Sequence, residues 1–267
     1  MPTYNKLLVA SSKGGVGKST TALGLAVAFA EAGKNVLLVD LDTASRSLDM
    51  LLGAEDHAIA DFGDIIDGGD VSNVAISPVS NLENLRLISA CNIDRLASLA
   101  KSKEKSPAEL IREGVERIID EGGFDILVCD TGGGIDFACA VVNLFDMTLI
   151  TSEQGKTSIR GAEYAASQLE ANGAGAMRLV ICAFDLEAVK KEKRAGMIEM
   201  IDSSALSCVG VVPFDPKLQG MQDKGKLPDK KSTTAIAYGN ISKRISGYDV
   251  MLFDGMKKLH KQRTKAL

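Results

Sequence analysis

The sequence of 267 residues is poor in the side chains that build several common kinds of site. It has only two histidines, His57 and His260, far apart in the chain, which argues against a histidine-rich metal site or a Ser-His-Asp triad. Its five cysteines form no CxxC pair and are odd in number, so we expect a reducing, cytoplasmic compartment. No run approaches the ~20 apolar residues that a membrane-spanning helix needs.

An excess of positive charge is also missing. The formal net charge is −4, so no overall field attracts nucleic acid, and DNA binding would need a local basic patch. Residues 190–194, with Lys190, Lys191, Lys193 and Arg194, offer such a patch, although a run of this kind is more often a solvated helix face. Apolar residues make up 45% and charged residues 25%, close to the average of soluble domains, which excludes a disordered chain.

Short apolar runs alternate with helical patterns along most of the chain. Continuous apolar runs of this length are typical of strands in a parallel sheet covered on both faces. The alternation predicts an α/β fold with a doubly wound, mostly parallel sheet flanked by helices. The expected strands are residues 6–10, 35–40, 85–89, 124–129, 147–150, 178–182 and 209–212.

Local signals place the helices and the domain. A helix is expected over residues 19–32, closed by Gly33, and another begins at the capping box of Ser106 and Glu109, with Pro107 in its first turn. The N-terminus leads directly into a glycine loop, so we interpret it as a first strand and not as a signal peptide. We expect one main domain over residues 1–247 and a C-terminal segment over residues 248–267.

The most informative segment is residues 12–20, which follow a strand and open a helix, as a phosphate-binding loop requires. Its glycines let backbone N–H groups approach phosphates, and the helix N-terminus adds partial positive charge. Lys18 is expected to bridge the β- and γ-phosphates, and Ser19 to bind Mg²⁺. The nucleotide-binding residues expected here are Gly14, Gly15, Val16, Gly17, Lys18, Ser19 and Thr20.

A second lysine lies inside this loop. Because Lys18 fills the usual role, Lys13 is expected to point away from its own nucleotide or toward another one; the alternative is a solvated surface charge. The loop also departs from the general GxxxxGK[ST] pattern, because its first glycine is Ser12.

Acidic residues end two of the expected strands, where open α/β sheets bind their ligands. Asp40 and Asp42 lie on the same side of an extended chain, so one can hold a Mg²⁺-bound water and the other can orient the attacking water. For Asp42 the alternative is helix capping. Asp130 follows a hydrophobic run, as a Walker-B-like carboxylate does, and is expected to contact Mg²⁺ through water.

On the motif KGGVGKST the chain resembles the MinD/ParA family of deviant Walker ATPases, P-loop NTPases of the SIMIBI type, and is closest to the MinD branch. The resemblance implies ATP and Mg²⁺ as cofactors and an ATP-sandwiched homodimer, in which Lys13 reaches the partner's phosphates. It further implies that Asp42 positions the water and that Asp40 supports Mg²⁺. The catalytic residues that the resemblance implies are therefore Lys13, Lys18 and Asp42. The residues that it assigns to the Mg²⁺ site are Ser19, Asp40 and Asp130.

The chain departs from this family at three places. Ser47 stands where an Asn is usual, and residues 131–134, Thr-Gly-Gly-Gly, replace the usual turn with proline, which raises the cost of ordering that loop. The Asn that reads adenine is absent from residues 180–185. The resemblance therefore implies that backbone groups and the loop of Pro213 and Asp215 bind the base.

The C-terminal segment carries an amphipathic pattern. Leu252, Met256 and Leu259 fall on one helical face, and basic residues continue through Arg263 and Lys265. Such a segment can lie on an anionic membrane, and members of the MinD branch end in a helix of this kind. The alternative is a last helix packed on the core with a frayed basic tail. The expected location is therefore cytoplasmic, with peripheral attachment to the inner face of the cell membrane left open.

The leading hypothesis is an ATP-dependent switch that positions cell-division machinery with the help of an activating partner, of the MinE kind or another. One alternative is the iron–sulfur carrier branch of the same superfamily, against which the missing CxxC pair argues. A second is a partitioning ATPase that coats DNA, for which the acidic balance makes DNA the weaker partner. A third is control of flagellar or pilus placement.

Overall fold

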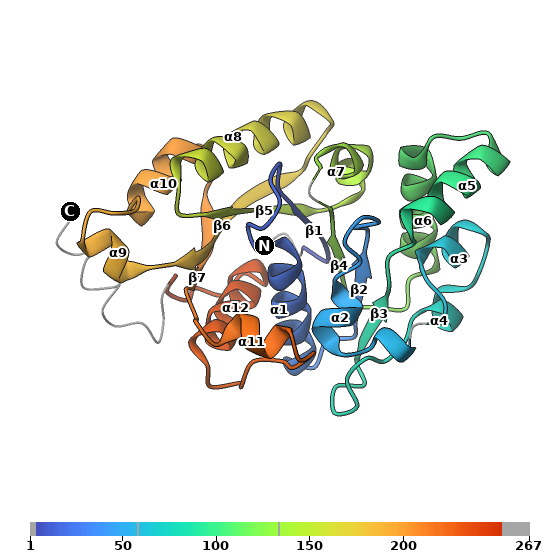
Figure 1. Ribbon diagram of the computed structural model, residues 1–267, viewed down its shortest axis with the longest axis horizontal. Coiled ribbons are helices and arrows are strands. Elements are labelled where there is room, and N and C mark those ends of the chain that lie inside the picture. Colours follow the sequence, from blue (N-terminus) through green and yellow to red (C-terminus); the bar gives the residue numbers. More distant parts are fainter. Residues whose placement is uncertain (1–3, 58, 133, 253–267) are drawn as a thin grey trace.

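The computed structural model describes residues 4–57, 59–132 and 134–252. Its centre is a sheet of seven parallel strands in the order β3-β2-β4-β1-β5-β6-β7 (Figure 1). The predicted doubly wound parallel sheet is thereby confirmed. The strands are β1 (Lys6–Ala10), β2 (Val36–Asp40), β3 (Leu85–Ile88), β4 (Ile126–Asp130), β5 (Met147–Glu153), β6 (Ala176–Phe184) and β7 (Cys208–Pro213).

The central strands β2 and β4 are hydrophobic up to their last residues, Asp40 and Asp130, because both faces of the sheet are covered. All five residues of β2 and of β4 are buried, as expected for a parallel sheet between two helix layers. Two strands are longer than the sequence predicts. β5 continues to Glu153 because it pairs with β6 as far as Cys182, and β6 continues to Phe184, which pairs with Pro213 of β7.

Two layers of helices enclose the sheet (Figure 1). In the first layer, α1 (Lys18–Glu31), α2 (Leu48–Leu52) and α12 (Thr233–Ile245) share a hydrophobic cluster with one face of the sheet, and α11 (Leu218–Gln222) lies beside them. The second layer covers the other face with α3 (Phe62–Ile66), α4 (Val71–Val74), α5 (Ile93–Lys103), α6 (Pro107–Glu121), α7 (Asp136–Val141), α8 (Lys156–Ala171), α9 (Leu186–Lys190) and α10 (Met197–Ser204).

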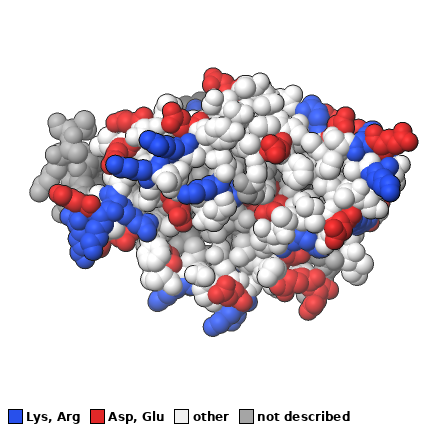
Figure 2. Space-filling view, turned by 45° about the horizontal axis from the view of Figure 1, so that its top comes forward, with Lys and Arg blue, Asp and Glu red and all other residues white. Residues whose placement is uncertain are grey.

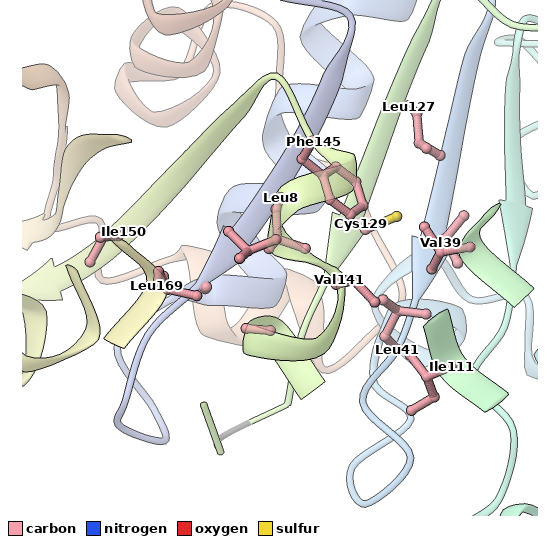
Figure 3. Close-up of a cluster of buried hydrophobic side chains, with 14 of the residues drawn as sticks. Leu8, Val39, Leu41, Ile111, Leu127, Cys129, Val141, Phe145, Ile150 and Leu169 are labelled. Atoms are coloured by element: carbon pink, nitrogen blue, oxygen red, sulfur yellow. The ribbon is translucent and has the colours of Figure 1, made fainter. Parts of the chain in front are cut away.

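The core beneath the second layer is built from strand residues that point toward it. Leu8 of β1 and Leu127 of β4 belong to the same buried cluster as Val141 and Phe145 (Figure 3). Cys129 belongs to the same cluster and has no exposed surface, so it is a small buried apolar residue of the core. Burial raises the pKa of the Cys129 thiol well above its ordinary value.

The helix ends follow the predicted local signals. The Ser106 hydroxyl accepts from the backbone N–H of Glu109 at 3.2 Å, and the Glu109 carboxylate accepts from the N–H of Ser106 at 2.7 Å. This confirms the capping box, which typically contributes about 1 kcal/mol. α1 ends at Glu31, and Gly33 follows with a φ of +82°, a conformation that glycine adopts without strain.

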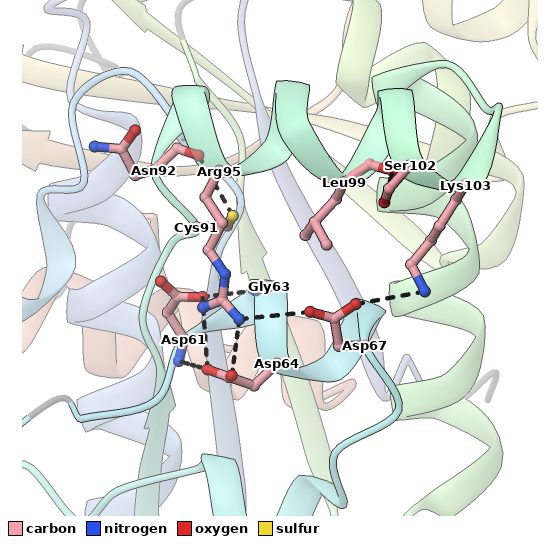
Figure 4. Close-up of polar contacts among 10 residues, drawn as sticks. All are labelled: Asp61, Gly63, Asp64, Asp67, Cys91, Asn92, Arg95, Leu99, Ser102 and Lys103. Atoms are coloured by element: carbon pink, nitrogen blue, oxygen red, sulfur yellow. Dashed lines mark hydrogen bonds and ion pairs between the residues drawn. The ribbon is translucent and has the colours of Figure 1, made fainter.

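A charge network joins α3 to α5 on the second layer (Figure 4). The Arg95 guanidinium donates to Asp61 at 2.6 Å and to Asp64 at 2.8 Å, and it lies 3.7 Å from a carboxylate oxygen of Asp67. Lys103 also pairs with Asp67, at 3.4 Å. The Arg95 hydrogen bond holds the pKa of Asp64 below its ordinary value.

The C-terminal segment is described only as far as Leu252, which packs against the hydrophobic cluster of the second layer. The predicted amphipathic pattern at Met256 and Leu259 and the basic residues Arg263 and Lys265 lie outside the described residues. The division between residues 1–247 and 248–267 therefore stays a prediction. In the described part of the chain, no helix is both long enough and apolar enough to cross a membrane.

Candidate functional site

The expected functional residues meet at the carboxyl edge of the sheet. Asp40 and Asp130 end neighbouring strands and face each other in register, and Val9 of β1 pairs with Asp130 on its other side. The backbone N–H of Leu41 donates to the carbonyl of Asp130 at 2.8 Å, which ties the two acidic strand ends together. The phosphate loop, residues 12–20, follows β1 directly at this edge.

Glycine is required at two positions of the phosphate loop. Gly15 and Gly17 have φ values of +75° and +88°, a region that side chains other than glycine rarely adopt. A Cβ at Gly17 would also lie 3.2 Å from the Cys182 side chain at the end of β6. Around Gly14 and Gly15 a Cβ would meet nothing within 4 Å, so the backbone there is accessible from outside.

The two lysines of the loop have different partners. Lys18 is buried, with 7% of its surface exposed, and its Nζ donates to the carbonyl of Lys13 at 3.1 Å. Burial lowers the pKa of Lys18, against the raising effect of Asp130 and Asp42. The exposed Nζ of Lys13 instead donates to Thr157 Oγ1 in the first turn of α8, at 3.0 Å. The second lysine thus lies against α8, and which nucleotide it serves stays a prediction.

Ser12, the departure from the general loop pattern, connects the loop to α8. Its hydroxyl donates to the carbonyl of Gly161 at 2.7 Å, and a Cβ at Gly161 would lie only 3.0 Å from that hydroxyl. Ser11 shapes the same flank, because its hydroxyl donates to the carbonyl of Lys13 at 2.7 Å and accepts the N–H of Lys13 at 3.0 Å. The loop is therefore attached to α8 by both Ser12 and Lys13.

Asp40 and Asp42 differ in their partners. Asp40 accepts from the N–H of Asp42 at 2.8 Å and from the N–H of Leu48 at 3.1 Å, so it caps the start of α2. Asp42 accepts from the N–H groups of Ala44 and Ser45, at 3.1 and 3.0 Å, and so shapes a turn. The helix capping considered for Asp42 belongs to Asp40. Burial raises the pKa of Asp40 to about 7.

Asp130 is the strongest sign that the site is built for a cation. It is fully buried, and neither carboxylate oxygen has a protein donor in hydrogen-bond geometry. Burial raises its pKa well above the ordinary value, and the neighbouring Asp40 adds to this, while Ser19 and Lys18 lower it. A buried carboxylate without donors is costly unless positive charge arrives, so these residues fit a magnesium–nucleotide complex. Among the described residues, no group of three or more His, Cys, Asp or Glu side chains could hold a metal ion by itself.

The loop that follows Asp130, residues 131–134, is better anchored than its glycine-rich sequence indicates. The Thr131 hydroxyl donates to the carbonyl of Val9 at 2.9 Å and is completely buried. A Cβ at Gly132 would lie 3.0 Å from Asp42 Oδ1, so this glycine allows the loop to approach Asp42 closely. Gly133 lies outside the described residues.

The base is expected near residues 180–185, at the end of β6, where the family's Asn is absent. A buried polar contact lies there instead. Cys182 Sγ lies 3.4 Å from Thr21 Oγ1, which lies 3.3 Å from the Tyr238 hydroxyl. Burial raises the pKa of the Cys182 thiol to about 12, so this thiol is a neutral packing group. Pro213 ends β7, and both oxygens of Asp215 are engaged, with the N–H of Lys217 and with the Thr234 hydroxyl. The base-binding role of Pro213 and Asp215 stays a prediction.

Several residues that shape the site carry no signal in the sequence. Thr157, Gly161 and Gln222 contact the phosphate loop or the first turn of α1 from positions more than 140 residues away in the chain. Each is a common polar or small residue in a helix, so only the packing of α8 and α11 against the loop reveals it.

Comparison with known proteins gives consistent relatives. Residues 3–246 match the ParA family model, described as NUBPL iron-transfer P-loop NTPase. The septum site-determining protein MinD of Synechocystis sp. is 29% identical over 253 residues, which cover 94% of this chain and 92% of that protein. The structure of MinD from Aquifex aeolicus superposes with a TM-score of 0.79 at 26% identity, covering 93% of this chain and 99% of that one. The structure of a MinC:MinD complex from the same organism also superposes with a TM-score of 0.79 at 26% identity, covering 93% of this chain and 98% of that one. The family and the fold predicted from the sequence are confirmed.

Proposed function

Because this chain belongs to the ParA family of P-loop NTPases, we propose that it is an ATP-binding and ATP-hydrolysing molecular switch of the MinD kind. In this proposal ATP brings two copies together, the dimer positions cell-division or similar machinery at the membrane, and hydrolysis separates the copies. The relatives named MinD support this choice of branch.

One observation carries the proposal: the two lysines of the phosphate loop point to different places. Lys18 Nζ stays inside the loop on the carbonyl of Lys13, where a triphosphate would meet it. Lys13 Nζ is directed outward to Thr157 on the exposed side. A cation that its own loop does not use is available to a second nucleotide, and in a symmetric dimer that nucleotide belongs to the partner.

The acidic residues complete the site. The Ser19 hydroxyl would hold Mg²⁺, with Asp40 and Asp130 reaching it through water; when bound, Mg²⁺ offsets the charge that develops on the phosphate oxygens. Asp42 would orient the water whose oxygen bonds to the terminal phosphorus as the bridging bond breaks, leaving ADP and inorganic phosphate. Asp42 lies beside the loop that follows Asp130, since a Cβ at Gly132 would come within 3.0 Å of its Oδ1, and this position supports the role.

Two kinds of partner follow from the proposal. The first is a second copy of this chain. The second is a protein that activates hydrolysis, of the MinE kind or another, and the structure of a MinC:MinD complex in a relative supports regulation by a bound protein. Control of flagellar or pilus placement uses the same cycle with different cargo.

A specific observation keeps DNA as a second candidate partner. Lys191, Lys193 and Arg194 are exposed, and Lys190 pairs only at the surface with Glu187, at 2.6 Å. Lys and Arg side chains gather at the left end of Figure 2, the end at which Figure 1 places α9. A patch of this kind binds anionic polymers or lipids in a salt-dependent way.

The iron–sulfur carrier remains the alternative suggested by the description of the family model. The five cysteines lie on separate elements or loops, Cys91 after β3, Cys129 on β4, Cys139 on α7, Cys182 on β6 and Cys208 on β7. A cluster held between two copies would need cysteines at a shared surface, and Cys129 and Cys182 are buried in the sheet. An iron determination on protein purified without air distinguishes this alternative.

The proposal is tested by co-sedimentation of the full chain with liposomes rich in anionic lipid, in Mg-ATP and in Mg-ADP. We expect sedimentation in ATP that is lost in ADP, in the Lys18→Ala variant, and in a chain truncated before Gly255. Retention on DNA with no sedimentation would favour the partitioning alternative. Equal behaviour in ATP and ADP would contradict a nucleotide-driven switch.

A further inference from the structure

The short helix α11 reaches the nucleotide site from the far end of the chain. Gln222, its last residue, donates from Nε2 to Thr20 Oγ1 at 3.1 Å, across 202 residues of sequence. Thr20 directly follows Lys18 and Ser19 in the first turn of α1. Thr20 and Gln222 also line one pocket together with Gly24, Leu218, Leu227 and Tyr238, between α1, α11 and α12.

The direction of this hydrogen bond has a chemical consequence. A threonine hydroxyl has one proton to donate and two lone pairs that accept. When Gln222 occupies a lone pair of Thr20, the hydroxyl proton remains free for another acceptor. Phosphate oxygens are acceptors only, so a hydroxyl held in this way beside a phosphate loop is set to donate to a phosphate.

The position of Gln222 is itself fixed by a backbone contact. A Cβ at Gly225, three residues beyond, would lie 2.5 Å from Gly53 Cα, so the two backbones touch and no side chain fits between them. Gly53 ends α2 with a φ of +62°, and Gly225 has a φ of +58°. The other end of α2 is capped by Asp40, whose Oδ2 accepts from the N–H of Leu48.

We propose that Gln222 is a positioning residue for the nucleotide, which holds the Thr20 hydroxyl so that its proton is directed at the bound phosphates. The Gly53–Gly225 contact keeps α11 in the place where Gln222 can do this. The inference rests on the proposed function, because it requires a nucleotide at the phosphate loop.

Titration calorimetry with Mg-ATP tests the role of Gln222. Gln222→Met keeps the length of the side chain and removes its donor, and we expect binding about 3- to 10-fold weaker, the range for one hydrogen bond. Gln222→Glu should weaken binding more, by about 10- to 100-fold, because the carboxylate accepts the Thr20 proton and repels the phosphates. Gln219→Met, an exposed residue on the same helix, is the matched control and should bind as the wild type does.

A double-mutant cycle separates positioning from a merely structural role. In a Thr20→Val background, where the hydroxyl is gone, Gln222→Met should cause no further loss of affinity. Full additivity of the two substitutions would overturn the proposal. So would wild-type affinity in Gln222→Met, or equal affinity in Gln222→Met and Gln222→Glu.

Gly225→Ala tests the backbone contact, and Gly220→Ala is its control, because a Cβ at Gly220 meets nothing within 4 Å. We expect Gly225→Ala to weaken Mg-ATP binding at least as much as Gln222→Met, and Gly220→Ala to leave it unchanged. Equal affinity in both glycine variants would contradict the role of the contact.

Two outcomes separate this inference from the proposed function. If the wild-type chain bound no Mg-ATP, the proposed function would fail together with this inference. If the wild type bound Mg-ATP and the Gln222→Met variant bound it equally well, this inference alone would be overturned.

Discussion

Lys13 Nζ donates to Thr157 Oγ1 at 3.0 Å, so the extra lysine of the phosphate loop lies against α8. Both groups are exposed, so the hydrogen bond is weak and can be exchanged for a stronger partner such as a phosphate. The buried Lys18 keeps the inward position, on the carbonyl of Lys13. The two lysines therefore have separable tasks.

This separation predicts different binding defects for the two lysines. Lys18→Ala should weaken Mg-ATP binding by at least about 100-fold, because it removes charge-assisted hydrogen bonds to the phosphates. Lys13→Ala should bind Mg-ATP within about threefold of the wild type, because Lys13 does not face its own site. Calorimetry measures both, and a Lys13→Ala variant as defective as Lys18→Ala would contradict the assignment.

Asp42 is expected to act on turnover and not on binding. Asp42→Ala should lower the steady-state rate of ATP hydrolysis by at least about 100-fold, the typical effect of losing a group that activates water. Asp42→Asn retains an oxygen for the bonds from Ala44 and Ser45, so it distinguishes lost chemistry from a collapsed turn. If Asp42→Asn hydrolyses ATP at the wild-type rate, Asp42 has only the structural role.

Two helical glycines should respond to alanine in opposite ways. A Cβ at Gly24 of α1 would overlap the ring of Tyr238, and overpacking of this kind typically costs 1–3 kcal/mol, so we expect Gly24→Ala to lose about 1–2 kcal/mol of stability. A Cβ at Gly239 of α12 meets nothing within 4 Å, so Gly239→Ala should gain about 0.5–1 kcal/mol from helix propensity. Urea unfolding of both variants checks this, and similar effects would show that the α1–α12 contact is looser than described.

The Arg95 network predicts a pH dependence with a definite sign. Because Arg95 lowers the pKa of Asp64 from its ordinary 3.8, the stabilisation is fully present above that pH and is lost as the pH falls below it. Asp64 is about one-third exposed, so solvent screening limits the effect, and Arg95→Met should cost about 1 kcal/mol at pH 7. The difference from the wild type should shrink below pH 4 in chemical unfolding experiments. Lys190→Met, from an exposed pair, is the control with little change, and a pH-independent cost for Arg95→Met would refute the ionic account.

The strands, the phosphate loop and the acidic strand ends of this site could be predicted because each depends on a local sequence pattern. Apolar runs predict the strands, and the glycines and lysines of residues 12–20 predict the loop between a strand and a helix. Asp40 and Asp130 could be placed together because the carboxyl ends of parallel strands share one edge of a sheet. The polar end of β5, residues 151–153, was missed because pairing with β6 defines it and hydrophobicity does not.

The contacts that surround the phosphate loop and the acidic strand ends could not be predicted, because they depend on how distant helices pack. Ser12 was recognised as a departure from the loop pattern, but its partner Gly161 follows only from the position of α8. Asp40, and not Asp42, caps a helix because the loop after β2 turns back so that Leu48 lies over the strand end. Gln222 reaches Thr20 only because two glycines allow α2 and the chain after α11 to touch.

The most direct test is the molar mass in solution, by sedimentation equilibrium, in the presence of Mg²⁺ and a slowly hydrolysed ATP analogue. We predict twice the chain mass for the wild type and the mass of a single chain for Lys13→Ala, with both bound to nucleotide. A wild type that stays monomeric with its site filled, or a Lys13→Ala variant that pairs as readily, would contradict the claim that this lysine serves a second copy.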